Sequence, residues 1–186
     1  SRIELKSVKI DLSSLPKRNR DEEALGRAFA EGLGIGNWRM DMFNGAASKK
    51  TEARGKLTVS CDSDAFRKGM NLGLMLAEAM NLTRRMAATP PNVCTPSHVA
   101  NTARMLARGV EGLSCTVITY QQARRLGMGG LENVGKGSAN KPCMVILDWK
   151  PAKTQTKEKL ALVGKSITYD TGGYSMKSGA GMKGMK

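Results

Sequence analysis

The sequence predicts an α/β fold: a small, partial N-terminal α/β domain over residues 1–62, a linking helix over residues 63–89, and the first part of a second α/β domain over residues 90–186. Two observations predict this fold. Short strand-like segments alternate with longer segments of helical periodicity, an order typical of α/β proteins. Hydrophobic residues make up 40% of the chain, which is enough for a packed core.

The first domain is predicted to hold two strands and a helix. "IELKSVKIDL" and "KLTVSCD" have the pattern of short strands, and "FNGAASKKTEARG" is expected to be an exposed basic connection. The acidic residues that open "DEEALGRAFAEGLGIGNWRM" suit a helix N-terminus. Leu25, Phe29 and Leu33 recur at four-residue spacing and predict the buried face of that helix.

The linking helix is predicted from "SDAFRKGMNLGLMLAEAMNLTRRMAAT", with Ser63 or Asp64 as its N-cap. In "TPPNVCTPSH" two prolines end this helix, and Pro96 lies near the first turn of the next one, "SHVANTARMLARGVEG". The apolar stripe of the linking helix comprises Phe66, Met70, Leu74 and Ala77.

The remainder is expected to alternate again. "LSCTVITY" predicts a strand and "QQARRLGMGG" a short helix with a glycine turn. "CMVILDWK" and "LALVGK", separated by the polar "PAKTQTKEK", are continuous apolar runs. Such runs are expected for strands in the middle of a sheet that is covered on both faces.

The chain is strongly basic, with a formal net charge of +14. A basic balance indicates a polyanionic partner, and nucleic acid is one candidate. The basic residues are nevertheless scattered, and the sequence has no RNA-recognition signature, zinc finger or ladder of aromatic residues. Acidic residues supplied by a longer chain would equally reduce the excess, so nucleic-acid binding is the weaker interpretation.

The cysteines, the single histidine and the apolar segments indicate where the protein resides and which kinds of site it has. Cys61, Cys94, Cys115 and Cys143 form no CxxC pair, so they predict reduced, mostly buried thiols rather than zinc or disulfide sites. The sole histidine, His98, is expected near a helix start. No apolar run is long enough for a membrane span and the N-terminus does not resemble a signal peptide. We expect a cytoplasmic protein, with an organelle matrix as the alternative.

Residues with catalytic chemistry gather in "LALVGKSITYDTGGYSMK". Lys165 ends an expected strand, Asp170 follows on the outgoing loop, Gly172 and Gly173 permit a tight turn, and Lys177 comes next. Asp170 could hold a divalent cation, which a lysine could join only as a neutral amine, while a charged lysine could polarise a carbonyl. From the residues alone, a salt bridge beside a glycine turn explains the pattern more readily than a metal site does.

The segment "ALVGKSITYDTGGYSMKSGAGMKGMK" resembles the signature region of the leucyl, or cytosol, aminopeptidase family of dinuclear metallo-exopeptidases. "NLTRRMAATPPNVCTPSHVA" and "LGMGGLENVGKGSANKPCMVILDW" are similar to upstream motifs of that family, and "AFAEGLGIGNWRMDMF" resembles a helix of its N-terminal domain. The resemblance covers residues 21–186 in order, and it implies that residues 90–186 are the first part of a metallopeptidase catalytic domain.

The resemblance implies roles for four residues. Lys165 and Asp170 match the first two metal ligands, Lys177 matches the lysine that polarises the scissile carbonyl, and Met185 matches a methionine lining the pocket for the substrate's N-terminal side chain. The implied reaction removes N-terminal amino acids from peptides. The implied cofactors are two divalent ions (zinc, manganese or magnesium) with bicarbonate as a base, and the implied assembly is a homohexamer.

The chain departs from the family pattern at two points. The family's remaining ligands, an Asp beyond Lys186 and the "NTDAEGR" segment, are not in these residues, and Lys183 stands where the family usually has Asp or Glu. Three alternatives therefore stay open. The first is a fragment of an aminopeptidase, and the second is a catalytically inactive member retained as a structural or nucleoprotein-binding protein. A plain nucleic-acid-binding module is the third.

Overall fold

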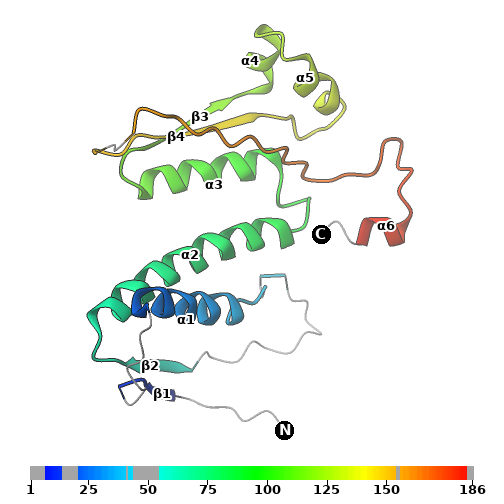
Figure 1. Cartoon of the computed structure of the whole chain (residues 1–186). Helices are drawn as coiled ribbons and strands as arrows, with labels where there is room; N and C mark the ends of the chain where they lie inside the picture. Colours follow the sequence, from blue (N-terminus) through cyan, green and yellow to red (C-terminus); the bar gives the residue numbers. More distant parts are fainter. Residues whose placement is uncertain (1–6, 14–20, 41, 44–54, 154–155, 184–186) are drawn as a thin grey trace. The chain divides into compact units, whose positions relative to one another are not determined.

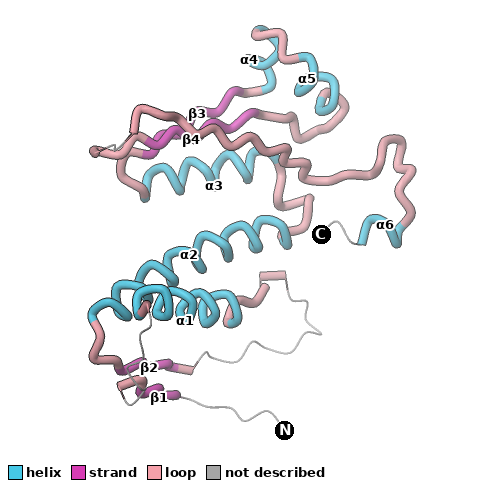
Figure 2. Tube along the Cα trace, in the orientation of Figure 1, coloured by secondary structure: helices cyan, strands magenta, loops and turns pink. Residues whose placement is uncertain are grey.

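The computed structural model describes residues 7–13, 21–40, 42–43, 55–153 and 156–183. Helices and strands are mixed in it, so the predicted α/β class is confirmed (Figures 1 and 2). The chain divides into two compact units, Ser1–Ala87 and Ala88–Lys186. None of the helices in the described ranges is long and apolar enough to cross a membrane.

The first unit contains two parallel strands and two helices. Strand β1 (Ser7–Asp11) pairs in parallel with β2 (Lys56–Ser60), with Ser7 opposite Lys56 and Asp11 opposite Ser60. The helices are α1 (Glu22–Gly36) and α2 (Asp64–Ala88). Both strands and both helices were predicted, although the beginning of the first predicted strand and most of the basic connection lie outside the described residues.

Glycines allow α1 and α2 to pack with their backbones in contact. A Cβ atom at Gly26 would collide with the carbonyl of Phe66, and a Cβ at Gly69 would collide with the carbonyl of Glu23. Ala30 and Ala77 are 0% and 1% exposed. Small residues are required along this interface because backbone atoms, unlike flexible side chains, cannot move aside.

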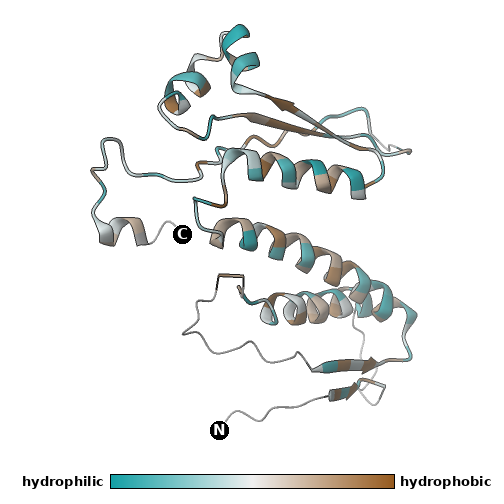
Figure 3. Cartoon of the chain, turned by 180° about the vertical axis from the view of Figure 1, so that it is seen from behind, coloured by the Kyte–Doolittle hydropathy of each residue, from teal (hydrophilic) through white to brown (hydrophobic). Residues whose placement is uncertain are grey.

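This close approach corrects the predicted buried faces. In α1, Leu25 is 40% exposed, so its predicted burial was wrong, whereas Phe29 and Leu33 are partly buried. In the apolar stripe of α2, Leu74 is 48% exposed. Burial of Phe66 and Ala77 is confirmed. Each helix buries the side that carries its small residues, and it carries apolar as well as polar positions elsewhere (Figure 3). The buried residues of the pair are Gly26 and Ala30 of α1 and Phe66, Gly69, Gly73 and Ala77 of α2.

Side chains cap the helix ends in this unit. Asp21 accepts a hydrogen bond from the N–H of Ala24 at the start of α1, and Ser63 accepts one from the N–H of Phe66, which confirms Ser63 as the N-cap of α2. At the other end of α1, Arg84 donates to the carbonyl of Ile35 at 2.9 Å while its guanidinium lies 4.3 Å from the ring centroid of Trp38. The second helix therefore adds a side-chain donor to a carbonyl at the end of the first, which also accepts from the N–H of Trp38.

The second unit is built on an antiparallel strand pair. Strand β3 (Leu113–Ile118) pairs with β4 (Met144–Trp149), Leu113 lying opposite Trp149. Helix α3 (Pro96–Gly109) packs against this pair (Figure 1). It begins as predicted, with Pro96 in its first turn and Thr95 accepting a hydrogen bond from the N–H of His98.

The connection between β3 and β4 holds one helix that was predicted and one that was not. Helix α4 (Tyr120–Arg125) opens with a capping box formed by Thr119 and Gln122. Helix α5 (Gly129–Gly135) occupies the stretch expected to be a glycine turn and its continuation. Its glycines disfavour a helix, but an ion pair of 2.8 Å between Arg124 and Glu132 joins it to α4. The last helix is α6 (Gly179–Lys183).

The sheet is less covered than predicted. Most residues of β4 are exposed, including Leu147 at 43% and Trp149 at 61%. The apolar run of β4 thus lies in a two-stranded sheet rather than in the middle of a covered one. All four cysteines are free, and only Cys94 is buried, so the prediction that most are buried was wrong. Burial raises the pKa of the partly buried Cys143 thiol above its ordinary value.

Candidate active site

The segment that carries the candidate site follows β4 without regular structure. Residues 160–165, predicted to form a strand, have no strand assignment. Leu160, Leu162 and Val163 are 87%, 89% and 96% exposed. A strand needs a neighbouring strand for its backbone hydrogen bonds. Within the described residues, the β3–β4 sheet has only two strands and residues 160–165 do not pair with either of them. Lys165, at the end of the segment, is exposed.

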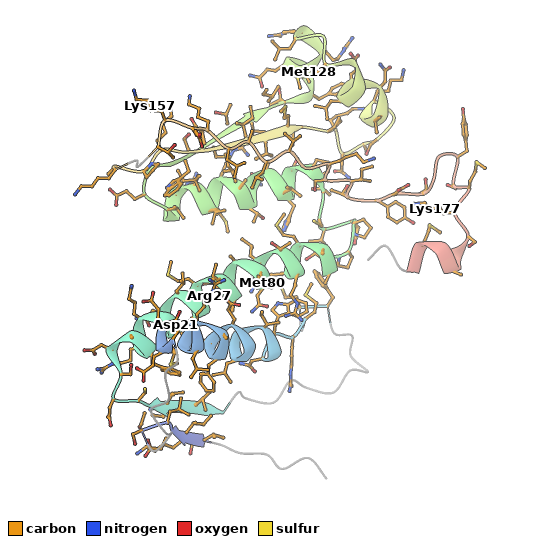
Figure 4. The ribbon with its side chains drawn as sticks, in the orientation of Figure 1. Asp21, Arg27, Met80, Met128, Lys157 and Lys177 are labelled. Carbon is orange, nitrogen blue, oxygen red and sulfur yellow. The ribbon has the colours of Figure 1, made fainter. Side chains whose placement is uncertain are left out.

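Asp170 and Lys177 come together across a tight loop. Nζ of Lys177 lies 2.8 Å from Oδ2 of Asp170, and the N–H of Gly172 donates to Oδ1 of Asp170 at 2.8 Å. The N–H of Lys177 also donates to the carbonyl of Thr171 at 2.9 Å. Both oxygens of the Asp170 carboxylate are therefore engaged. The position of Lys177 ahead of α6 can be followed in Figure 4.

The loop uses backbone conformations that explain its glycines. Gly172 and Gly173 have φ values of +79° and +83°, in the left-handed region, and Tyr174 and Ser175 follow at +48° and +55°. A Cβ atom at Gly172 would lie 2.8 Å from Cγ of Lys177. The tight turn predicted at the glycines is confirmed, and Gly172 also leaves room for the lysine to cross the loop.

The electrostatics keep Asp170 ionised. The hydrogen bond from the Lys177 ammonium, followed by the one from the Gly172 N–H, holds the pKa of the Asp170 carboxyl below its ordinary value. The charge of Lys165 adds a smaller effect in the same direction. The structure therefore brings Asp170 and Lys177 into direct contact, whereas Lys165 acts on Asp170 through its charge. Met185 lies outside the described residues.

The residues present fit one side of a metal site. The ionised Asp170 offers the hard oxygen that divalent cations bind, and Lys165 fits as a ligand only as a neutral amine. Within the described residues, no group of three or more His, Cys, Asp or Glu side chains could hold a metal ion. A closed metal cage therefore needs ligands beyond those that this part of the chain supplies.

A pocket of about 270 Å³, lined by both polar and apolar side chains, adjoins the same segment. Thr168 and Tyr169, which directly precede Asp170, line it on one side. Its other walls come from "PPNVCTP" and "GSAN", which belong to the upstream motifs with a family resemblance and were not expected to line a cavity. The remaining lining residues are Pro91, Asn92, Thr95, Pro96, Ser138 and Asn140.

Comparison with known proteins defines the class and then the family. Residues 81–186 match the catalytic domain of a peptidase family, described as the cytosol aminopeptidase family. A probable cytosol aminopeptidase of Aquifex aeolicus is 37% identical over 172 residues, covering 92% of this chain and 34% of that protein. The cytosol aminopeptidase of Pseudomonas aeruginosa PAO1 is 35% identical over 178 residues, covering 94% of this chain and 36% of that protein. The chain belongs to the cytosol aminopeptidase family.

Solved structures agree on the fold. The bottromycin maturation enzyme BotP in complex with Mn is 29% identical with a TM-score of 0.66, covering 79% of this chain and 30% of that chain. A tomato leucine aminopeptidase mutant has a TM-score of 0.75 at 23% identity, covering 89% of this chain and 34% of that one, and shows the fold alone. The chain spans about a third of the length of the curated relatives it matches.

Proposed function

We propose that the whole protein is a metal-dependent aminopeptidase that releases N-terminal amino acids from peptides, and that this chain supplies part of its active centre. The observation that carries the proposal is the Asp170–Lys177 loop, which lies inside the family match. An ionised carboxylate and a charged lysine held at a tight turn suit hydrolysis of a peptide bond.

Each residue of the loop has a proposed task. Asp170 and Lys165 would hold divalent metal, which when bound supplies Lewis-acid activation of water. The Lys177 ammonium would donate to the carbonyl oxygen of the scissile peptide bond and stabilise the negative charge that develops there. Met185 would contact the substrate's N-terminal side chain. Manganese, zinc and magnesium all remain candidates, bicarbonate is a proposed base, and a cytoplasmic homohexamer is the proposed assembly.

The test is hydrolysis of leucine p-nitroanilide by the full-length protein with added manganese. We expect Lys177→Ala to lower kcat by about 100-fold or more, because it removes a donor to the transition-state oxyanion. Lys150→Ala is the matched control: its ammonium pairs with Asp148 at 3.2 Å, outside the loop. Equal activity of Lys177→Ala and wild type would refute the role of Lys177.

A second function is favoured by charge. The chain carries a net charge of +14, and Lys183 adds a cation where the family pattern that the sequence resembles has an acid. An inactive member that binds nucleoprotein is therefore the alternative proposal. Retention of the full-length protein on RNA across a salt series tests it, with affinity expected to fall steeply as salt rises. Absence of retention at low salt would exclude this alternative.

A further inference from the structure

The loop contains an ion pair between Lys177 and Asp170 that the family resemblance did not predict. Lys177 is matched to a residue that acts on substrate, yet its ammonium lies 2.8 Å from Asp170, the residue matched to a metal ligand. The Lys177 ammonium and a bound metal ion would therefore compete for the Asp170 carboxylate. The side chains of Lys177 and Asp170 are 26% and 42% exposed, so both are accessible to solvent.

The loop geometry favours this ion pair. Gly172 lacks the Cβ that would lie 2.8 Å from Cγ of Lys177, so the lysine stem passes close over the loop backbone. The Gly172 N–H holds Oδ1 of Asp170, which leaves Oδ2 facing the lysine. Tyr174 and Ser175 adopt left-handed φ values, +48° and +55°, between the two partners. Such conformations are unfavourable for residues other than glycine and persist only where surrounding contacts hold them.

We propose that Lys177 is the resident counter-ion of Asp170, and that a divalent cation must displace its ammonium from the carboxylate in order to bind. Two cations on one carboxylate oxygen repel each other, and an ionised carboxylate without any partner is unfavourable unless fully hydrated. Metal loading would therefore release the lysine side chain. The residue that stabilises the metal-free loop would become available for the substrate carbonyl only when metal is present.

The inference rests on the metal-binding role proposed for Asp170, and metal affinity tests it directly. The full-length protein is stripped of metal and titrated calorimetrically with MnCl₂, as wild type and as Lys177→Gln and Lys177→Arg. Lys177→Gln removes the competing charge and should bind manganese about two- to fivefold more tightly, the range expected for an exposed ion pair. Lys177→Arg should bind more weakly than wild type, because guanidinium grips a carboxylate through two parallel hydrogen bonds.

Three further measurements complete the test. Lys150→Gln is the control, because Lys150 pairs with Asp148 and not with Asp170, and it should leave manganese affinity unchanged. Amide hydrogen exchange of wild type should quicken in residues 171–177 when manganese is added, because the ion pair that closes the loop is lost. Circular dichroism of the metal-free variants establishes that they are folded.

The outcomes separate this inference from the proposed function. Equal manganese affinity for wild type, Lys177→Gln and Lys177→Arg overturns the counter-ion role while leaving the aminopeptidase proposal intact. Tighter binding by Lys177→Gln with Lys177→Arg equal to wild type indicates unspecific repulsion and also overturns it. Binding by Lys177→Gln but not by wild type supports the counter-ion role and counts against activity. Binding by neither overturns both proposals.

Discussion

The α1–α2 pair and the segment over residues 156–177 use similar residue types with opposite results. In the helix pair, Ala30 and Ala77 are 0% and 1% exposed, and Arg84 of α2 donates to the carbonyl of Ile35 at the end of α1. In the later segment, Leu162 and Val163 are 89% and 96% exposed. An apolar run is buried only where another element covers it. The two helices cover each other, whereas no described element covers the apolar side chains of the later segment.

The largest effect is expected at the point of closest helix contact. Gly69→Ala would drive a methyl group into the carbonyl of Glu23, and should lower the free energy of unfolding by about 3 kcal/mol. Gly32→Ala, in α1 where an added methyl group would meet no neighbouring atom, is the matched control and should raise it by about 0.5–1 kcal/mol. Urea unfolding of the chain measures both, and equal effects would show that the helices are not in backbone contact.

An intermediate effect is expected from the helix cap. Arg84→Ala removes a charged donor from the carbonyl of Ile35, which keeps its hydrogen bond from the N–H of Trp38 at 3.3 Å, and it removes the contact with the Trp38 ring. We expect a loss of about 1–2 kcal/mol in the free energy of unfolding. Arg67→Ala, a solvent-exposed arginine of the same helix that pairs with Asp64, should change it by less than about 0.5 kcal/mol. A smaller loss for Arg84→Ala than for Arg67→Ala would contradict the capping role.

The smallest effect is expected in the exposed segment. Val163→Ser should change the unfolding free energy of the 186-residue chain by less than about 0.5 kcal/mol. The same substitution at Val145, which is partly buried in β4 opposite Val117, should cost about 1 kcal/mol. If Val163→Ser lowered the free energy of unfolding as much as Val145→Ser, residues 160–165 would have to be buried against another element.

Local signals predicted much of this fold because they act over a few residues. Ser63 was predicted as an N-cap and Pro96 as a first-turn residue, and the strand patterns placed β2, β3 and β4. The capping by Thr95 was not predicted. Signals that depend on distant partners were misread. Leu25 and Leu74 have helical spacing, but the side of each helix that is buried depends on where the opposing backbone can approach.

The candidate site divides in the same way. The sequence by itself determined the residue types of the loop, its turn glycines and the family to which they belong, since these are properties of neighbouring residues and of their order. Only the tertiary structure decided that Lys177 pairs with Asp170 while Lys165 is exposed, and that "LALVGK" is uncovered. The physical reason is that an ion pair or a strand needs a second partner, and the position of that partner is set by the path of the whole chain.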